Sequence, residues 1–444
     1  MRTITLYKRE KYLSRLIDAS KSEQIKILTG IRRAGKSSLL KLFKEYLLNS
    51  GIDNKHIIEI NFEDMKFKHM QYLEVYYSIR KQINDEKEYY ILLDEIQNIH
   101  QWEDIVNSLR VEFNTNIYIA TSNSYFYNSK YLTYLSGRFV EIRILPLSFA
   151  EFVIFNDCEI KQEKTMLNNP IINIYDSSQK IVDKKELFSK YLSIGSIPLY
   201  SIDKDIIYDY RIAALESSIN TIIVKDILGH SKNKNYKKVN NSDLVINILT
   251  YLARNIGSSI SISKIGQELL KEKIITIDEL PSPTSSIDYV NVLVSTYLLY
   301  PIYRYDLKRK EILKTLGKYY IVDFGIRNYL LGANLEDLED LEFQIENIVF
   351  FELLKRGYIP RIGKINDVEI DFVIWNTKSV SYIQVTHNLY DENTLNRELN
   401  SLLKIKDNYK KIILTYEPHP EKNIKGVEII SLLDFLLDED FPLF

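Results

Sequence analysis

The stretch "ILTGIRRAGKSSLLKLF" constrains the fold more than any other, because this chain of 444 residues contains only 14 glycines. Gly30, Gly35, Lys36 and Ser37 satisfy the spacing G-x-x-x-x-G-K-[ST]. A short apolar run precedes them and a helical periodicity follows. Glycines let such a loop curl so that its backbone N–H groups point inward at phosphate oxygens, beside the positive end of the helix. The stretch therefore predicts a strand, a phosphate-binding loop and a helix.

The loop predicts ATP and Mg²⁺ as cofactors. Lys36 would reach the β- and γ-phosphates, and the Ser37 hydroxyl would bind the metal. A plain glycine turn that caps a helix is the alternative, and the flanking strand and helix disfavour it. The predicted nucleotide-binding residues are Gly30, Ile31, Arg32, Arg33, Ala34, Gly35, Lys36, Ser37 and Ser38.

A pair of carboxylates follows a second apolar run, "EYYILLDEIQNI". Such a continuous run is typical of a central parallel strand covered on both faces. Ligands of open α/β sheets bind at the carboxyl ends of the strands, so Asp94 is predicted to hold Mg²⁺ through water and Glu95 to activate the attacking water. An acidic pair that merely caps the next helix is the alternative.

A third strand, "NIYIATSN", ends in polar side chains. In ATPases with an Asp-Glu pair, the strand between the loop strand and the acidic strand commonly ends in a residue that positions the water. Asn123 is the first candidate for this role and Ser122 the second. A simple Asn/Ser turn that closes the strand is an equally open interpretation.

Gly137 and Arg138 open a further strand in "YLSGRFVEIRILPLSFAEF". Arg138 could act as an arginine finger that stabilises charge on the transferred phosphoryl group, in cis or from a neighbouring subunit. A solvated surface arginine is the alternative.

Composition excludes several classes of protein. The 58 Lys and Arg residues nearly balance the 60 Asp and Glu residues, so the net charge is −2 and no global basic field indicates nucleic acid. Cys158 is the single cysteine, and no Cys/His cluster has the spacing of a zinc site. The sequence also lacks a signal peptide and an apolar run of about 18 residues. We therefore expect a cytoplasmic protein of several domains without a membrane partner.

These motifs, in their order and spacing, resemble the bacterial and archaeal AAA-type P-loop ATPases that carry a C-terminal domain of unknown function. The resemblance continues through "YLSIGSIPLY", "KYYIVDFGIRNYLLG", "ENIVFFELLKRGY" and "EIDFVIW", and so covers nearly the whole chain. It implies binding of ATP with Mg²⁺, hydrolysis, and an AAA-like topology. By this likeness the loop binds nucleotide, Asp94 and Glu95 are the acidic pair, and Arg138 is the family's arginine. One departure is that the family more often has glycine where Thr121 or Ser122 stands.

The predicted fold class is α/β, with four regions along the chain. They are a P-loop, AAA-like ATPase core (1–155), an insertion and helical lid (156–235), a winged helix (236–316), and a restriction-endonuclease-like α/β domain (317–444) predicted to be inactive.

The predicted winged helix is poorly suited to reading DNA sequence. Its third helix, "SPTSSIDYVNVLVSTYLLY", contains no lysine or arginine. The wing carries Arg304, Lys308, Arg309 and Lys310, which leaves a non-specific DNA contact open, although solvated charges at a hairpin tip are more frequent. A structural or protein-contact role is favoured.

The C-terminal block resembles the restriction-endonuclease-like fold but departs from its catalytic pattern. Active members use a helix glutamate, a strand aspartate and Glu-x-Lys on the next strand. Glu346, Glu369 and Asp371 are present, whereas residues 384–386 read Gln-Val-Thr and supply no lysine. A nuclease centre is therefore predicted to be incomplete, and His387 is read as an ordinary hydrogen-bonded side chain.

The leading functional hypothesis is a Mg²⁺-dependent ATPase that acts as a switch or remodeller on an unknown protein partner, with a homo-oligomer left open. Two alternatives remain: an ATP-gated nucleic-acid-processing enzyme with its chemistry near Asp371, and an adaptor that binds ATP without hydrolysing it.

Overall fold

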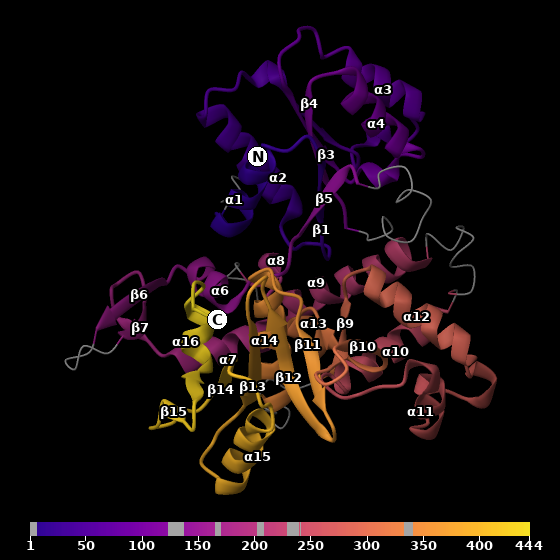
Figure 1. Ribbon diagram of the computed structural model, residues 1–444. Coiled ribbons are helices and arrows are strands. Elements are labelled where there is room, and N and C mark those ends of the chain that lie inside the picture. Colours follow the sequence, from indigo (N-terminus) through magenta and orange to yellow (C-terminus); the bar gives the residue numbers. More distant parts are fainter. Residues whose placement is uncertain are drawn as a thin grey trace. The chain divides into compact units, whose positions relative to one another are not determined.

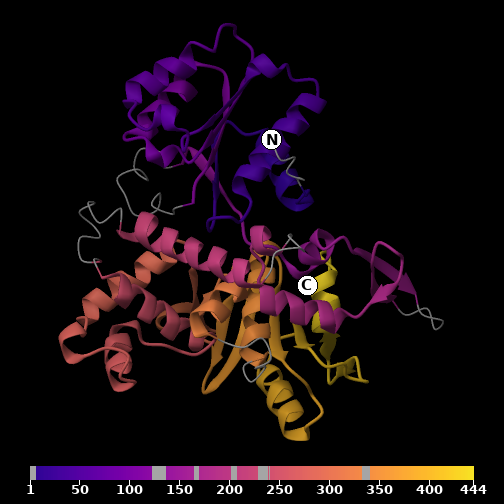
Figure 2. The same ribbon diagram turned by 180° about the vertical axis from the view of Figure 1, so that it is seen from behind.

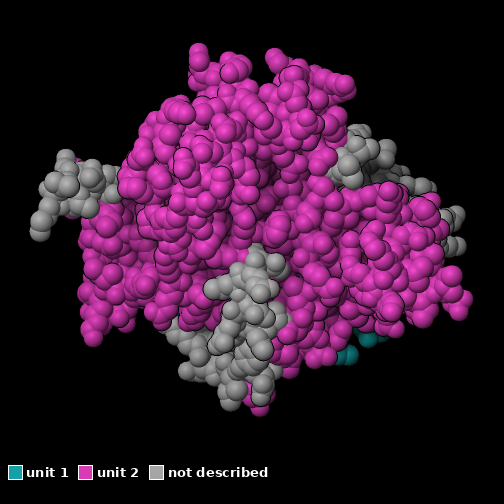
Figure 3. Space-filling model, turned by 90° about the horizontal axis from the view of Figure 1, so that it is seen from below, with its two compact units in different colours: residues 1–146, 295–297 teal, residues 147–294, 298–444 magenta. Residues whose placement is uncertain are grey.

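A computed structural model describes residues 7–122, 137–164, 170–201, 208–228, 239, 241–332 and 341–444. The chain divides into two compact units, coloured separately in Figure 3. Unit 1 comprises residues 1–146 and 295–297, and unit 2 comprises residues 147–294 and 298–444. Within the described ranges we find no helix long and apolar enough to span a bilayer.

Unit 1 is built on a five-stranded sheet whose pairs are all parallel, in the order β2-β3-β4-β1-β5 (Figure 1). The strands are β1 (Ile25–Thr29), β2 (Ile57–Asn61), β3 (Tyr89–Asp94), β4 (Thr115–Ala120) and β5 (Phe139–Arg143). In this order β4 lies between the loop strand and the acidic strand, as the sequence predicts. Because all five strands run the same way, their carboxyl ends form one edge of the sheet.

Helices cover both faces of this sheet (Figures 1 and 2). The helices are α1 (Glu10–Ala19), α2 (Lys36–Asn49), α3 (Tyr72–Arg80) and α4 (Trp102–Glu112), with short 3₁₀ turns η1 (Asn54–His56), η2 (Met65–Phe67) and η3 (Ile96–Asn98). On one face Ile27 and Ile91 share a buried cluster with Trp102 of α4. On the other face the ring of Phe43 in α2 lies 4.4 Å from that of Tyr118 in β4. This covering explains the unbroken apolar runs of β1 and β3.

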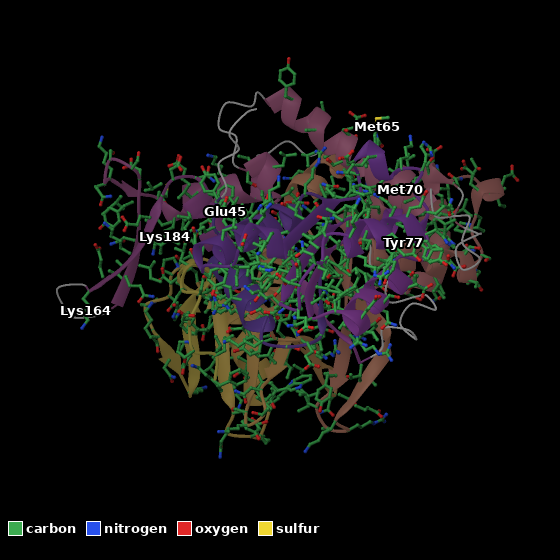
Figure 4. The ribbon with its side chains drawn as sticks, turned by 90° about the horizontal axis from the view of Figure 1, so that it is seen from above. Glu45, Met65, Met70, Tyr77, Lys164 and Lys184 are labelled. Carbon is green, nitrogen blue, oxygen red and sulfur yellow. The ribbon has the colours of Figure 1, made fainter. Side chains whose placement is uncertain are left out.

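The polar segment after the core folds into a small antiparallel sheet in unit 2. Its strands, in the order β6-β7-β8, are β6 (Glu159–Lys164), β7 (Pro170–Tyr175) and β8 (Ile181–Val182). Lys164, at the end of β6, is labelled in Figure 4. The sequence predicts this segment only as a surface insertion.

Helices make up much of the rest of unit 2. They are α6 (Phe149–Phe155), α7 (Lys184–Ile194), α8 (Pro198–Ser201), α9 (Tyr208–Thr221), α10 (Ser242–Arg254), α11 (Ile265–Lys271), α12 (Pro283–Ser295), α13 (Phe324–Leu331), α14 (Leu341–Lys355), α15 (Glu392–Leu403) and α16 (Leu432–Leu437), with 3₁₀ turns η6 (Ile262–Lys264) and η7 (Ile277–Glu279). The helix predicted from "DYRIAALESSINTIIVKDILGH" is α9, which continues as the π-helical η5 (Ile222–Leu228).

An eight-stranded mixed sheet forms the other part of unit 2, in the order β10-β9-β11-β12-β13-β14-β16-β15. The strands are β9 (Leu299–Asp306), β10 (Glu311–Ile321), β11 (Arg361–Ile365), β12 (Val368–Trp375), β13 (Val380–Thr386), β14 (Lys410–Thr415), β15 (Asn423–Ile424) and β16 (Val427–Ser431). Helices α10, α11 and α12 precede the β9–β10 hairpin in the order predicted for a winged helix. The hairpin is nevertheless part of the C-terminal sheet, and β10 crosses the boundary predicted between residues 316 and 317.

Buried polar contacts join the lid region to the C-terminal part of unit 2. The Asp323 carboxylate accepts hydrogen bonds from the backbone N–H and hydroxyl of Ser196 and from the N–H of Ile326. The Lys355 ammonium, 4% exposed, lies 3.3 Å from Glu151 of α6, which precedes the predicted lid and also belongs to unit 2. "YLSIGSIPLY" and "YYIVDFG" therefore meet at one buried carboxylate, so these motifs serve packing within unit 2.

Candidate nucleotide site

The two glycines of the predicted phosphate loop are required for different reasons. Gly30 has φ +137°, and a Cβ there would lie 2.1 Å from the carbonyl oxygen of Ile144. Gly35 has φ +98°, and a Cβ there would meet nothing within 4 Å. Arg33 between them also has a positive φ, of 67°. Gly30 thus permits close approach of the chain segment after β5, whereas Gly35 sets the backbone turn that starts α2.

The Lys36 side chain lies within the loop. Its ammonium donates hydrogen bonds to the carbonyl oxygens of Gly30 and Ile31, each at 2.9 Å. These contacts partly compensate the burial of the charge. Phosphate oxygens carry full negative charge, so they would compete well for the same ammonium.

The remaining loop residues divide between packing and surface. Ile31 and Ala34 are fully buried. The Arg32 guanidinium lies 3.8 Å from the Glu63 carboxylate. Ser38 is half-buried in the first turn of α2.

Asp94, the last residue of β3, lies beside the first turn of α2. The Ser37 side chain interacts with its carboxylate and opposes the rise of its pKa, and the Asn61 amide lies 3.4 Å from its Oδ2. Its Oδ1 is buried and has no hydrogen-bond partner among the described residues. Burial is the main cause that raises the pKa of Asp94 to about 6, with Glu95 adding to the rise and Lys36 opposing it. A hydroxyl and an unpartnered carboxylate oxygen are ligands that Mg²⁺ accepts, so Ser37 and Asp94 fit the predicted metal site.

Glu95 occupies a left-handed backbone conformation, with φ +55°. Its N–H donates to the Ala120 carbonyl oxygen at 2.8 Å, which fixes it at the carboxyl edge between β3 and β4. Its carboxylate accepts a hydrogen bond from the Ser122 hydroxyl at 3.1 Å and another from the Gln97 amide. Sequence reasoning missed Gln97, although its place two residues after Glu95 was the available signal.

Of the two candidates for positioning the water, Ser122 is buried and contacts Glu95. Asn123, the first candidate, lies outside the described residues. Which of the two residues positions the water therefore stays a prediction, but the structure brings Ser122 into contact with Glu95.

Arg138 immediately precedes β5, at the amino edge of the sheet. Its carbonyl oxygen accepts from the N–H of Ile25, and its guanidinium donates to Asn107 at 3.2 Å. The phosphate loop begins after Thr29, at the opposite end of β1. The structure therefore does not bring Arg138 to the loop and the acidic pair of its own chain.

The Arg9 side chain links the phosphate loop to the end of unit 1. One guanidinium nitrogen donates to the carbonyl oxygens of Ala34 at 3.0 Å and Leu145 at 2.8 Å. The other donates to the carbonyl oxygen of Pro146 at 3.1 Å. Sequence reasoning assigned no role to Arg9.

A second cluster of ionisable side chains lies in unit 2, where the sequence predicts an incomplete nuclease centre. The Lys318 ammonium of β10 lies 2.8 Å from Glu346 and 3.0 Å from Glu369. Burial lowers the pKa of Lys318, but Glu346, Asp371 and Glu369 together raise it above the ordinary value. The pKa of Asp371 is raised well above its usual range, first by burial and then by Glu346.

Gln384, at the position expected for a metal-binding glutamate, is itself neutral and forms two hydrogen bonds within the protein. Its amide oxygen accepts from the N–H of Asp371 at 2.7 Å, and its amide nitrogen donates to Glu398 at 2.8 Å. Among the described residues no group of three or more His, Cys, Asp or Glu side chains could hold a metal ion. His387 stacks on Tyr416, with 5.7 Å between ring centroids. The cluster thus contains a lysine, Lys318, but it lies on β10 and forms ion pairs with Glu346 and Glu369.

The charges of the predicted wing are mostly engaged within the protein. Arg304 donates to Ser259 and lies 3.3 Å from Glu369, while Arg309 lies 3.5 Å from Glu311. Lys308 donates to the side chain of Asn366 at 2.7 Å. A DNA contact through the wing stays a prediction.

Comparison with protein families finds two matching domain models. Residues 22–153 match an AAA domain, and residues 185–337 match a domain of unknown function (DUF8612). An uncharacterized protein of Haemophilus influenzae is 34% identical over 431 residues, which cover 97% of this chain and 98% of the relative. The chain belongs to this family of AAA-domain proteins. An uncharacterized protein of Methanocaldococcus jannaschii is 28% identical and is covered over 90% of its length.

Among solved structures, a Walker-type ATPase of Pyrococcus abyssi aligns with a TM-score of 0.46 and 14% identity, covering 73% of this chain and 95% of that one. The RuvB Holliday junction branch migration motor of Thermotoga maritima aligns with a TM-score of 0.30 and 13% identity, covering 66% of this chain and 89% of that one.

The family assignment and the parallel sheet agree on the fold of unit 1, which is the P-loop ATPase core of an AAA-domain protein. The C-terminal region carries a mixed sheet. Its likeness to restriction endonucleases stays a prediction.

Proposed function

We propose that this chain is a Mg²⁺-dependent ATPase that works as a nucleotide-driven switch or remodeller. The observation that carries the proposal is the position of Asp94 and Glu95 at the carboxyl edge of the sheet, where Asp94 interacts with Ser37 in the first turn of the helix that follows the glycine loop. Phosphoryl transfer needs this combination of an anion cradle, a metal site and a group that orients water.

The residues divide the work in a simple way. The loop N–H groups and Lys36 hold the phosphates, while Ser37 and Asp94 hold Mg²⁺, which when bound offsets the phosphate charge. Glu95 accepts the proton of the attacking water. Lys36 exchanges its two backbone acceptors for phosphate oxygens when nucleotide enters.

The contacts within unit 2 support a switch. Besides the buried contact of Asp323 with Ser196, Lys185 of α7 pairs with Glu417 at 2.7 Å and Lys184 with Asp434 at 2.6 Å. Lys184 is labelled in Figure 4. A lid joined in this way to the C-terminal sheet carries that sheet along when nucleotide alters the lid.

Steady-state ATP hydrolysis tests the proposal. Lys36→Ala is expected to lose nucleotide binding, and Glu95→Gln to bind nucleotide but hydrolyse it at least 100-fold more slowly, in line with loss of a general base. Glu45→Gln changes an exposed carboxylate of α2 and is the matched control. Turnover at the wild-type rate by both site variants would refute the assignment, while binding without phosphate release by the wild type would favour the adaptor.

We further propose that Arg138 acts on a neighbouring subunit of a homo-oligomer. Register places it about five residues from the loop end of β1, roughly 17 Å along the strand. Mixing Arg138→Ala with Lys36→Ala subunits should then restore turnover that each lacks alone. No restoration in a mixture shown to co-assemble would rule out a trans role.

The partner is proposed to be a protein, because most of the wing's basic side chains are paired within the chain. Glu95→Gln, which should stay in the nucleotide-bound state, is the variant to use for copurification. Recovery of nucleic acid instead of protein would favour the nucleic-acid alternative.

A further inference from the structure

The side chain of Glu95 is held by two residues that come from different elements. Ser122 lies just after β4, and its hydroxyl donates to Oε2 of Glu95 at 3.1 Å. Gln97 belongs to the 3₁₀ turn η3, and its amide nitrogen donates to the same Oε2. Both donors therefore act on one oxygen of the carboxylate.

The local backbone brings Gln97 back to Glu95. The left-handed conformation of Glu95 turns the chain sharply after β3, and the N–H of Asn98 donates to the Glu95 carbonyl oxygen at 3.1 Å. Ile96, fully buried in the core cluster, anchors the turn. This turn brings the side chain two residues after the glutamate to its carboxylate.

The contact has an energetic cost that packing does not explain. The other amide atom of Gln97, Oε1, is buried and has no hydrogen-bond partner among the described residues. Leaving such an acceptor unsatisfied is unfavourable, because it loses its hydration without gaining a hydrogen bond within the protein. An apolar side chain of the same length would avoid this cost but could not donate to Glu95. The observation points to a role for the donor nitrogen.

We propose that Gln97 and Ser122 are positioning residues that fix the carboxylate of Glu95 for general-base catalysis. This inference rests on the proposed ATPase function and deepens it. With Oε2 held by two donors, the carboxylate plane is set and Oε1 is the oxygen that accepts the proton.

The step served by this arrangement is the hydrolysis itself. The oxygen of water forms a bond to the γ-phosphorus, and the bond from that phosphorus to the β–γ bridging oxygen breaks. The electron pair leaves on ADP, and the proton of the water goes to Glu95. A glutamate with free side-chain torsions would spend much of its time outside hydrogen-bond reach of the water, so fixing it raises kcat and leaves nucleotide binding unchanged.

Gln97→Met tests the amide, because methionine has nearly the same length and cannot donate. We expect kcat for ATP to fall about 10-fold, which is less than the loss expected for removing the base itself, with KM within 2-fold of wild type. Gln82→Met, an exposed glutamine of the same unit, is the matched control and should leave both constants unchanged. Ser122→Ala should resemble Gln97→Met, and Ser122→Thr, which keeps the hydroxyl, should recover most of the lost turnover.

The double variant Gln97→Met/Glu95→Gln separates positioning from a merely structural role. If Gln97 acts only through Glu95, it should hydrolyse ATP at the same residual rate as Glu95→Gln alone. Additive losses would overturn the inference, as would a kcat loss that comes with equal loss of nucleotide affinity or melting temperature. Wild-type turnover by Gln97→Met would also overturn it. If the wild-type protein did not hydrolyse ATP, that result would instead refute the proposed ATPase function.

Discussion

Replacing Asp94 by asparagine should stabilise unit 1 in the absence of metal and nucleotide. Burial raises the pKa of Asp94 from 3.8 to about 6, and the side chain is only 8% exposed. The folded state therefore holds this proton more tightly than the unfolded state, so stability falls as pH rises from about 4 to 6 and stays low above that. Asparagine removes the charge and hence the penalty.

The size of the effect follows from the difference in pKa. At about 1.4 kcal/mol per pKa unit, the ionised carboxylate destabilises the fold by about 3 kcal/mol at pH 8, about half as much at pH 5, and little at pH 4. Asp94→Asn should therefore gain about 3 kcal/mol in free energy of unfolding at pH 8, and that gain should shrink in acid.

Urea denaturation followed by tryptophan fluorescence measures this gain. The chain has two tryptophans, and Trp102 is buried in unit 1, so a Trp375→Phe background makes the signal specific for that unit. Buffers contain EDTA, and Glu45→Gln serves as the exposed carboxylate control, expected to differ little from wild type at any pH. A gain that is absent at pH 8, or equally large at pH 4, would refute the reasoning. With Mg²⁺ and ATP added the order should reverse, because the variant loses the stabilisation that ligand binding supplies to wild type.

Gly30→Ala should prevent unit 1 from folding, because its Cβ would lie 2.1 Å from a backbone oxygen, whereas Gly35→Ala should fold but lose nucleotide affinity. Circular dichroism measures the folding of both variants and calorimetry their nucleotide binding. A stably folded Gly30→Ala variant would contradict the predicted clash. Lys318→Met should destabilise unit 2 by about 3–5 kcal/mol, because it leaves the Glu346 carboxylate buried without its cation. An unchanged midpoint of urea denaturation would show that this ion pair does not stabilise the fold. Asp323→Ala should make limited proteolysis of the lid faster, because it removes the acceptor of the buried Ser196 and Ile326 N–H groups. Equal rates of digestion for wild type and variant would contradict this expectation.

The core could be predicted from sequence because its signals are local. The loop glycines lie at fixed spacing from Lys36 and Ser37, and the strand before Asp94 is a continuous apolar run. A parallel sheet gathers the ends of such strands at one edge, so the meeting of Ser37 with Asp94 follows from pattern and topology together.

Contacts between residues distant in sequence could not be predicted in the same way. Lys318 finds Glu346 and Glu369 on a helix and a strand that follow it by 28 and 51 positions, and no local spacing encodes that meeting. The signal that existed was a lysine within the strand-like run "GKYYIV", which burial would require to be paired. The Gln97 contact depends on a left-handed turn at Glu95, a conformation that glutamate residues seldom adopt.

The hairpin within the C-terminal sheet bears on how this chain can be dissected. A fragment starting at residue 317 would begin in the middle of β10 and lack β9, whose residue Arg304 is in register with Ile362 of β11. β11 would then be an exposed edge strand whose unpaired backbone groups could pair with other chains, and the fragment would be expected to aggregate. A recombinant fragment that starts at residue 147 keeps the hairpin, the lid and the buried contact of Ser196 with Asp323, and so leaves β11 paired with β9.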